Sequence, residues 1–157
     1  MRKLLPCFAL LAMCVVGAAA QQSKSAHVLM PVDQIKWGAP PPVLEKSASF
    51  AVLSGDPGKA GLFVVRLRMP AGYQIAPHWH PTDEHVTVIS GTFSVGMGEK
   101  MDKAALKSLP VGSYVLLPAE SRHFAVATTE TIVQIEGPGP FVLNYVNPAD
   151  DPSKRSK

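Results

Sequence analysis

Stretches in which every second residue is apolar run through most of the chain after residue 48. In residues 62–69, Phe63, Val65 and Leu67 fall on one side, while Arg66 and Arg68 fall on the other. A period of two is typical of β-strands with one buried face. Comparable patterns predict strands over residues 49–53, 84–90, 92–97, 113–117, 122–127, 131–136 and 141–146.

Clusters of glycine, proline, aspartate and serine separate these strands, for example in residues 54–58, 70–72 and 137–140. Residues 99–109 are the one helical candidate, with a weak apolar side, and Pro110 ends it. Turn signals spaced roughly eight to twelve residues apart, with almost no helix, are typical of all-β domains. The pattern therefore predicts an all-β sandwich or closed barrel with one short helix.

The length of 157 residues fits one domain, with a segment on either side. Residues 21–48 form an expected N-terminal arm, which contains a short apolar run at 27–30 that could be a strand. The arm ends in a rigid connector with three consecutive prolines at 40–42. Residues 49–146 are the expected β-domain, and residues 147–157 are a polar C-terminal tail.

Residues 1–20 have the layout of a secretory signal peptide. Arg2 and Lys3 precede an apolar run without charge that ends in Ala18-Ala19-Ala20. The run is short for a membrane-spanning helix, and Pro6 interrupts it, so a stable membrane anchor is disfavoured. A lipidation box ending at Cys14 is the third reading, but Met13 is large for the position before the cysteine. We expect cleavage near Ala20 and a periplasmic or secreted protein.

The leader contains both cysteines, Cys7 and Cys14, so the exported chain would have no thiol. Its removal excludes disulfides, cysteine nucleophiles and cysteine–zinc sites. Arg2 and Lys3 are also two of the 15 basic residues, which leaves 13 against 12 acidic residues. This near-neutral balance gives no electrostatic basis for binding nucleic acid.

Residues 72–91, GYQIAPHWHPTDEHVTVISG, contain three of the five histidines. His78 and His80 are two apart, so on a strand both imidazoles point to one face. A turn at residues 81–83 then reverses the chain, and Glu84 shares the inward face of the next strand with Val86. Two imidazoles and a carboxylate that converge in this way form most of a transition-metal site. The alternative, a hydrogen-bonded core histidine, would bury a carboxylate beside two bases without a cation, which is costly.

His123 could supply a fourth ligand from a distant strand, since it begins the run 123–127 after a turn. His85 alternates against Glu84 and should face away from the site. Asp83 is expected to be a turn residue, Trp79 a packing residue, and Gln74 a residue on the ligand face within reach of a substrate.

These motifs resemble those of the cupin superfamily, a set of small jelly-roll β-barrels. Gly72, His78, His80, Glu84 and Gly91 match every fixed position of the first cupin motif. The second motif is matched by Gly112, Pro118 and His123, whereas Glu120 replaces a glycine and Ala127 replaces an asparagine. The loss of glycine at 120 should bend the turn but keep the ligand, and Ala127 should leave the pocket less polar.

The resemblance implies a single cupin-type jelly-roll β-barrel whose metal is held by His78, His80, Glu84 and His123, and it implies a homodimer. Nitrogen and oxygen ligands suit divalent Fe, Mn, Ni, Co, Cu or Zn. Four protein ligands leave coordination positions for a small-molecule ligand or substrate. Three functions follow: a dioxygenase-like oxidoreductase acting on a chelating substrate, a non-redox isomerase or decarboxylase, or a non-catalytic module that binds metal or a small ligand.

Overall fold

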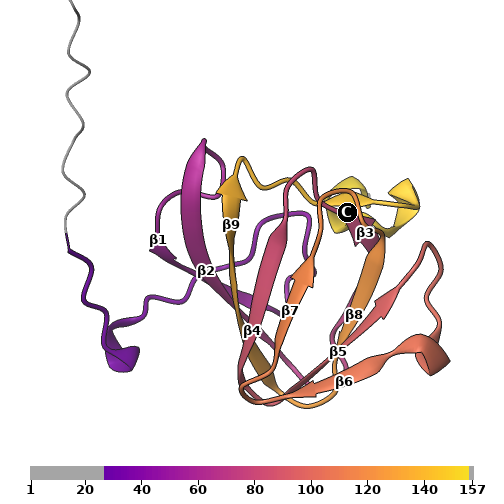
Figure 1. Ribbon diagram of the computed structural model, residues 1–157, viewed down its shortest axis with the longest axis horizontal. Coiled ribbons are helices and arrows are strands. Elements are labelled where there is room, and N and C mark those ends of the chain that lie inside the picture. Colours follow the sequence, from indigo (N-terminus) through magenta and orange to yellow (C-terminus); the bar gives the residue numbers. More distant parts are fainter. Residues whose placement is uncertain (1–26, 156–157) are drawn as a thin grey trace, which may run out of the picture.

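The structure is a computed structural model that describes residues 27–155. It contains ten β-strands in two antiparallel five-stranded sheets that face each other (Figure 1). One sheet has the strand order β1-β2-β9-β4-β7 and the other has the order β10-β3-β8-β5-β6. Strands that are neighbours in space are mostly distant in sequence, as in a jelly roll. The predicted all-β class is confirmed, although the described strands form an open sandwich and not a closed barrel.

The first sheet is built from β1 (Ser49–Ser54), β2 (Gly61–Met69), β9 (Thr131–Gly139), β4 (Glu84–Ser90) and β7 (Tyr114–Leu117). The second is built from β10 (Asn144–Tyr145), β3 (Gln74–Trp79), β8 (His123–Ala127), β5 (Thr92–Met97) and β6 (Lys107–Pro110). Four 3-10 turns complete the described elements: η1 (Val32–Gln34), η2 (Lys103–Ala105), η3 (Pro148–Asp150) and η4 (Pro152–Lys154).

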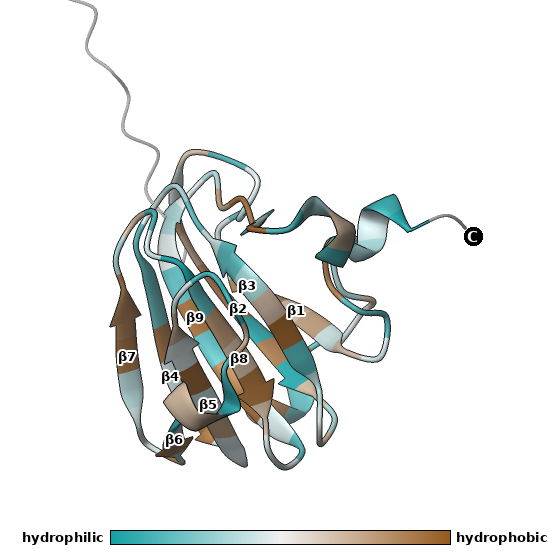
Figure 2. Cartoon of the chain, turned by 90° about the vertical axis from the view of Figure 1, so that its right-hand side faces the viewer, coloured by the Kyte–Doolittle hydropathy of each residue, from teal (hydrophilic) through white to brown (hydrophobic). Residues whose placement is uncertain are grey.

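The core lies between the sheets and is formed by the predicted apolar faces. Phe63, Val65 and Leu67 on β2 are at most 2% exposed, while Arg66 and Arg68 lie on the outer side. Figure 2 shows the resulting bands of hydrophobic and polar residues along the strands. Burying these apolar faces removes them from water, which is the main stabilising contribution to a sandwich of this kind.

Two predicted elements differ from the structure. Residues 99–109, expected as the short helix, contain only the 3-10 turn η2 and then β6, which pairs with β5. Backbone hydrogen bonds from the exposed edge of β5 outweigh the weak helical preference of an Ala-Ala-Leu run. The predicted strand 141–146 is reduced to β10, because Phe141 and Leu143 turn towards the inside of the sandwich.

The N-terminal arm packs against the sandwich before it enters β1. Gly38 forms two backbone hydrogen bonds with Phe50, and Leu44 packs into the core. The apolar run at 27–30 is not a strand in the structure and is exposed. Among residues 27–155, no helix has the length and apolar character needed to cross a bilayer. The expected leader, residues 1–20, lies outside the described residues.

Candidate metal centre

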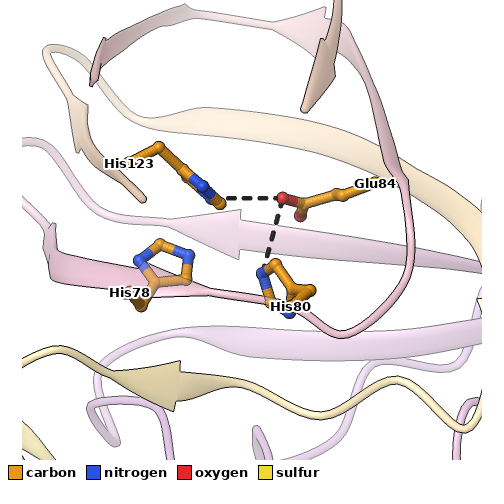
Figure 3. A group of neighbouring side chains, drawn as sticks. All are labelled: His78, His80, Glu84 and His123. Carbon is orange, nitrogen blue, oxygen red and sulfur yellow. Dashed lines mark ion pairs between the residues drawn. The ribbon is translucent and has the colours of Figure 1, made fainter. Parts of the chain in front are cut away.

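Four predicted ligands meet inside the sandwich, carried by three strands and a turn. His78 lies on β3 directly opposite His123, the first residue of β8. His80 follows the end of β3, and Glu84 begins β4 in the facing sheet. The donor atoms of these four residues all lie within 4.8 Å of one another (Figure 3). The convergence expected from the sequence is therefore present in the structure.

Two hydrogen bonds hold the loops that carry these ligands together. The amide of Glu120 donates to the carbonyl of His80 at 2.7 Å, and the amide of Ala119 donates to Asp83 Oδ1 at 2.8 Å. Asp83 is thus a turn residue, as predicted, and it joins the turn before Glu84 to the turn before His123.

Glu120 has a positive φ of 62°, in the region that favours glycine. As expected, this replacement leaves His123 in the cluster. The side chain of Glu120 is exposed, and its backbone adopts the left-handed conformation despite the Cβ. The link between the two loops is therefore preserved at the cost of local backbone strain.

The imidazoles are oriented by backbone carbonyls on the side away from Glu84. His78 Nδ1 lies 2.8 Å from the carbonyl oxygen of Ala76. His80 Nδ1 lies 2.9 Å from that of Val142, and His123 Nδ1 lies 3.0 Å from that of Ser121. A carbonyl only accepts, so each Nδ1 carries the proton and donates it. The neutral ring then presents the lone pair of Nε2 to the centre, the arrangement found in histidines that bind metals.

Glu84 faces these lone pairs with a carboxylate. Its Oε2 lies 3.3 Å from His123 Nε2 and 3.5 Å from His80 Nε2, and none of these side chains is more than 8% exposed. Burial by itself would raise the pKa of Glu84, but the contact with His123 and the nearby imidazoles hold it below its ordinary value of 4.5. The carboxyl group is therefore charged at neutral pH.

Burial also keeps His78 and His80 neutral. It lowers the pKa of His78 from 6.5 to about 3, with a further contribution from the imidazoles of His123 and His80. Burial likewise lowers the pKa of His80, against the opposing effect of Glu84. Neutral imidazoles and an ionised carboxylate are the states in which these groups bind a metal.

The donor set fits a divalent transition metal. His80 Nε2 is buried without a hydrogen-bond partner, and it points at three other electron-pair donors. Four acceptors in one buried spot repel each other unless a proton or a cation lies between them. A buried cluster of three imidazoles and one carboxylate therefore fits metal binding of the kind found in cupins, without selecting one metal.

A cavity of about 280 Å³ opens beside the cluster. Among residues 27–155, His78, His80 and Glu84 are the only polar side chains in its wall. The remaining wall is apolar and includes Phe50, Val65, Leu67, Ile75, Ile135 and Phe141. A wider groove of about 750 Å³ lies between the proline connector and the C-terminal turns, but it contains none of the four ligands. We therefore expect a small-molecule ligand or substrate to bind in the smaller cavity, which borders the candidate metal ligands.

Phe141 was not singled out by the sequence, yet it contacts the site directly. Its ring stacks on His80 with centroids 4.1 Å apart and an interplanar angle of 12°. The same ring lies 5.0 Å from that of Phe63, which anchors it in the core. Only the tertiary fold could reveal this contact, because 61 positions of sequence separate Phe141 from His80.

Gln74 was expected on the ligand face, and this is wrong. The pairing of β3 with β8 shifts register between Ile75 and His78, which inverts the alternation along β3. Ile75 is consequently buried in the cavity wall, and Gln74 is exposed.

The residues expected outside the site are outside it. His85 lies on the outer side of β4, where its Nδ1 is 2.6 Å from the hydroxyl oxygen of Tyr114. Trp79 packs under the guanidinium of Arg122, which lies 5.1 Å from the centroid of the Trp79 ring.

Ala127 was expected to make the pocket less polar. It is fully buried in the core and does not border the cavity, so this effect on cavity polarity is not borne out.

The chain belongs to the cupin superfamily, in the family of ChrR cupin-like domains. The model of that family matches residues 25–141, which include both motifs and every strand except β10. A search of curated protein sequences found no match.

Several solved structures share the fold at low sequence identity. A candidate acetylacetone dioxygenase from Methylibium petroleiphilum superposes with a TM-score of 0.63 at 20% identity, covering 83% of this chain and 88% of its own. The polyketide cyclase RemF from Streptomyces resistomycificus also superposes with a TM-score of 0.63, at 16% identity, and the match covers 85% of this chain and 92% of RemF. The structure of the anti-sigma factor ChrR of Rhodobacter sphaeroides in complex with SigE superposes with a TM-score of 0.51 at 17% identity. The match covers 68% of this chain and 50% of the other chain.

Proposed function

We propose that this chain is an exported, metal-dependent oxidoreductase of the dioxygenase type that acts on a small chelating substrate. The single observation that carries the proposal is the buried His78–His80–Glu84–His123 cluster opening onto an apolar cavity. Export is supported by the leader pattern of residues 1–20. The fold shared with a candidate acetylacetone dioxygenase is consistent with the oxidative chemistry.

The residues around the cavity favour one class of substrate. The four candidate ligands would hold a divalent ion at the cavity, whose remaining wall is apolar. When bound, such an ion supplies Lewis acidity and, if it is redox-active, a site at which substrate and dioxygen meet. The apolar wall orients the carbon skeleton and excludes water, so the polar contacts of the substrate are made at its two chelating oxygens.

The net charge of the metal-loaded site indicates which charge the substrate should carry. Glu84 contributes one negative charge and the three imidazoles contribute none, so a divalent ion leaves the site with one positive charge. A substrate that binds as a monoanion, such as an enolate, makes the buried site neutral. We therefore expect enolisable diketones and related hydroxyketones to bind better than dianionic acids.

Oxygen uptake by metal-reconstituted protein tests the proposal. Protein loaded with Fe(II) and given acetylacetone or catechol should consume oxygen, whereas the zinc-loaded protein should not. His123→Ala should abolish uptake, and His85→Ala serves as the matched histidine control. Substrate loss that persists without oxygen and with zinc would instead assign a non-redox isomerase or decarboxylase.

A non-catalytic binding function is the second candidate. Apart from the metal ligands, no titratable side chain lines the cavity, so the described chain offers no separate general acid or base there. The shared fold with the anti-sigma factor ChrR is consistent with a binding role. Tight binding of a chelator, measured by calorimetry, with no product formed under any metal or gas, would select this function.

A further inference from the structure

The proline connector and the two residues after it form a partition between the cavity at the metal centre and the wider outer groove. Pro40 and Pro42 line the groove of about 750 Å³, whereas Pro41 and Val43 line the cavity of about 280 Å³. Leu44 lines both, and within the part of the chain that the structure describes it is the one residue that does so. The Leu44 side chain therefore separates the two spaces.

The backbone on both sides of Leu44 is held in place by tyrosine hydroxyls. Tyr145 Oη donates to the carbonyl of Val43 at 2.8 Å, and Tyr73 Oη donates to the carbonyl of Glu45 at 3.2 Å. Leu44 itself is 8% exposed and packs in the core cluster. Its side chain therefore has a fixed position in the partition, and moving it would cost core packing.

A ligand that binds at the four candidate metal ligands can extend in only one direction. The second space beside the cluster, which His78, Glu84 and His123 border, is about 20 Å³. A single water needs roughly 10–15 Å³, so no carbon skeleton fits there. The rest of the ligand has to lie in the cavity of about 280 Å³, which is small for a ligand site, since such sites usually measure about 300–1,000 Å³.

We propose that Leu44 is a specificity-determining residue, which closes the cavity towards the outer groove and so limits the length of the substrate. The inference rests on the proposed function, because it concerns the chelating substrate of the same site. A short chain fits between the metal ligands and Leu44, whereas a longer chain would have to displace Leu44 from the core. With a smaller side chain at position 44 the two spaces join, and an alkyl chain can continue into the groove.

Calorimetry with linear β-diketones of increasing chain length, beginning with acetylacetone, tests the limit. The protein is loaded with zinc, so that binding is measured without oxidation. In the unchanged protein the affinity should rise with each added methylene until the cavity is filled, and then fall. Leu44→Ala should move the maximum to longer chains. The long members should bind to it at least tenfold more tightly than to the unchanged protein, because each buried methylene contributes roughly fourfold.

Leu143→Ala is the matched control. Leu143 lines the same cavity but not the groove, so this change removes the same atoms without joining the two spaces. It should leave the maximum at the original chain length. Leu44→Val is a milder variant that should shift the maximum less, in the same direction, and circular dichroism melting verifies that each variant is folded. An unshifted maximum in folded Leu44→Ala and Leu44→Val, or an equal shift in Leu143→Ala, would overturn the proposal.

Linear alcohols and the metal-free protein separate this inference from the proposed function. His80 Nε2 is buried without a partner among residues 27–155, so it can accept a hydrogen bond from an alcohol whose chain lies in the apolar cavity. Leu44→Ala should lengthen the preferred alcohol, as it does the preferred diketone. If no diketone binds but the preferred alcohol lengthens, the proposed function fails and the role of Leu44 stands. If diketones bind but neither series responds to Leu44→Ala, the role of Leu44 is refuted and the proposed function stands.

Discussion

Among the four candidate ligands, His80 has the environment most specific for a metal. Its Nδ1 is held by the Val142 carbonyl, its ring stacks on Phe141, and its Nε2 has no partner among the described residues. We expect His80→Ala to lower metal content and the melting temperature, because a bound metal stabilises the folded state. Elemental analysis and calorimetry measure the two effects. His85→Ala, on the outer side of β4 in the facing sheet, should change neither, and full metal stoichiometry in His80→Ala would reject the ligand assignment.

Glu120 is a second residue with a testable local property. Its left-handed backbone conformation costs on the order of 1–2 kcal/mol for a residue with a Cβ. Glycine removes that cost but has more freedom in the unfolded chain, so Glu120→Gly should stabilise the protein by a net amount on the order of 1 kcal/mol. Urea unfolding measures the change. Glu120→Ala is the control that removes the side-chain charge but keeps the Cβ. It should give no comparable gain, and equal stabilisation by alanine would refute the strain argument.

At the scale of elements, the segment between β9 and β10 closes one side of the site. Phe141 in this segment contacts both His80 and the core residue Phe63. Phe141→Ala should keep all four ligands but loosen His80, and residues that orient a ligand typically change metal affinity by about 10- to 100-fold. Competition with a chromophoric chelator measures this affinity. Phe50→Ala removes an aromatic ring from the same cavity wall without a stacking contact to a ligand, so it should weaken metal binding much less.

The strands show where the alternation of apolar and polar residues predicts the buried face correctly and where it does not. The alternation in β2 and β4 predicted which side chains are buried, because each strand packs one face against the opposite sheet. The same rule failed in β3, since a register shift between Ile75 and His78 reverses the faces. The helix expected over residues 99–109 was wrong for another reason, because an available sheet edge at β5 made residues 107–110 a strand.

For the whole molecule, the buried histidines make the stability of the metal-free protein depend on pH. Burial and the neighbouring imidazoles lower the pKa of His78 to about 3, whereas in the unfolded chain it is near 6.5. Below pH 6.5 the unfolded state therefore binds protons that the folded state does not, and stability falls as the pH falls from 6.5 towards 3. Denaturant midpoints measured in a metal chelator between pH 8 and pH 4 should show this fall. His78→Leu should reduce the slope without abolishing it, because His80 shifts in the same direction.

The sequence by itself determined the β-strand pattern, the four candidate ligands and the cupin motifs, since these depend on periodicity and spacing along the chain. Only the tertiary structure determined the carbonyls that orient each imidazole, the stacking of Phe141 on His80 and the apolar wall of the cavity. Those features join residues far apart in the chain, and they arise from packing, which no local pattern encodes.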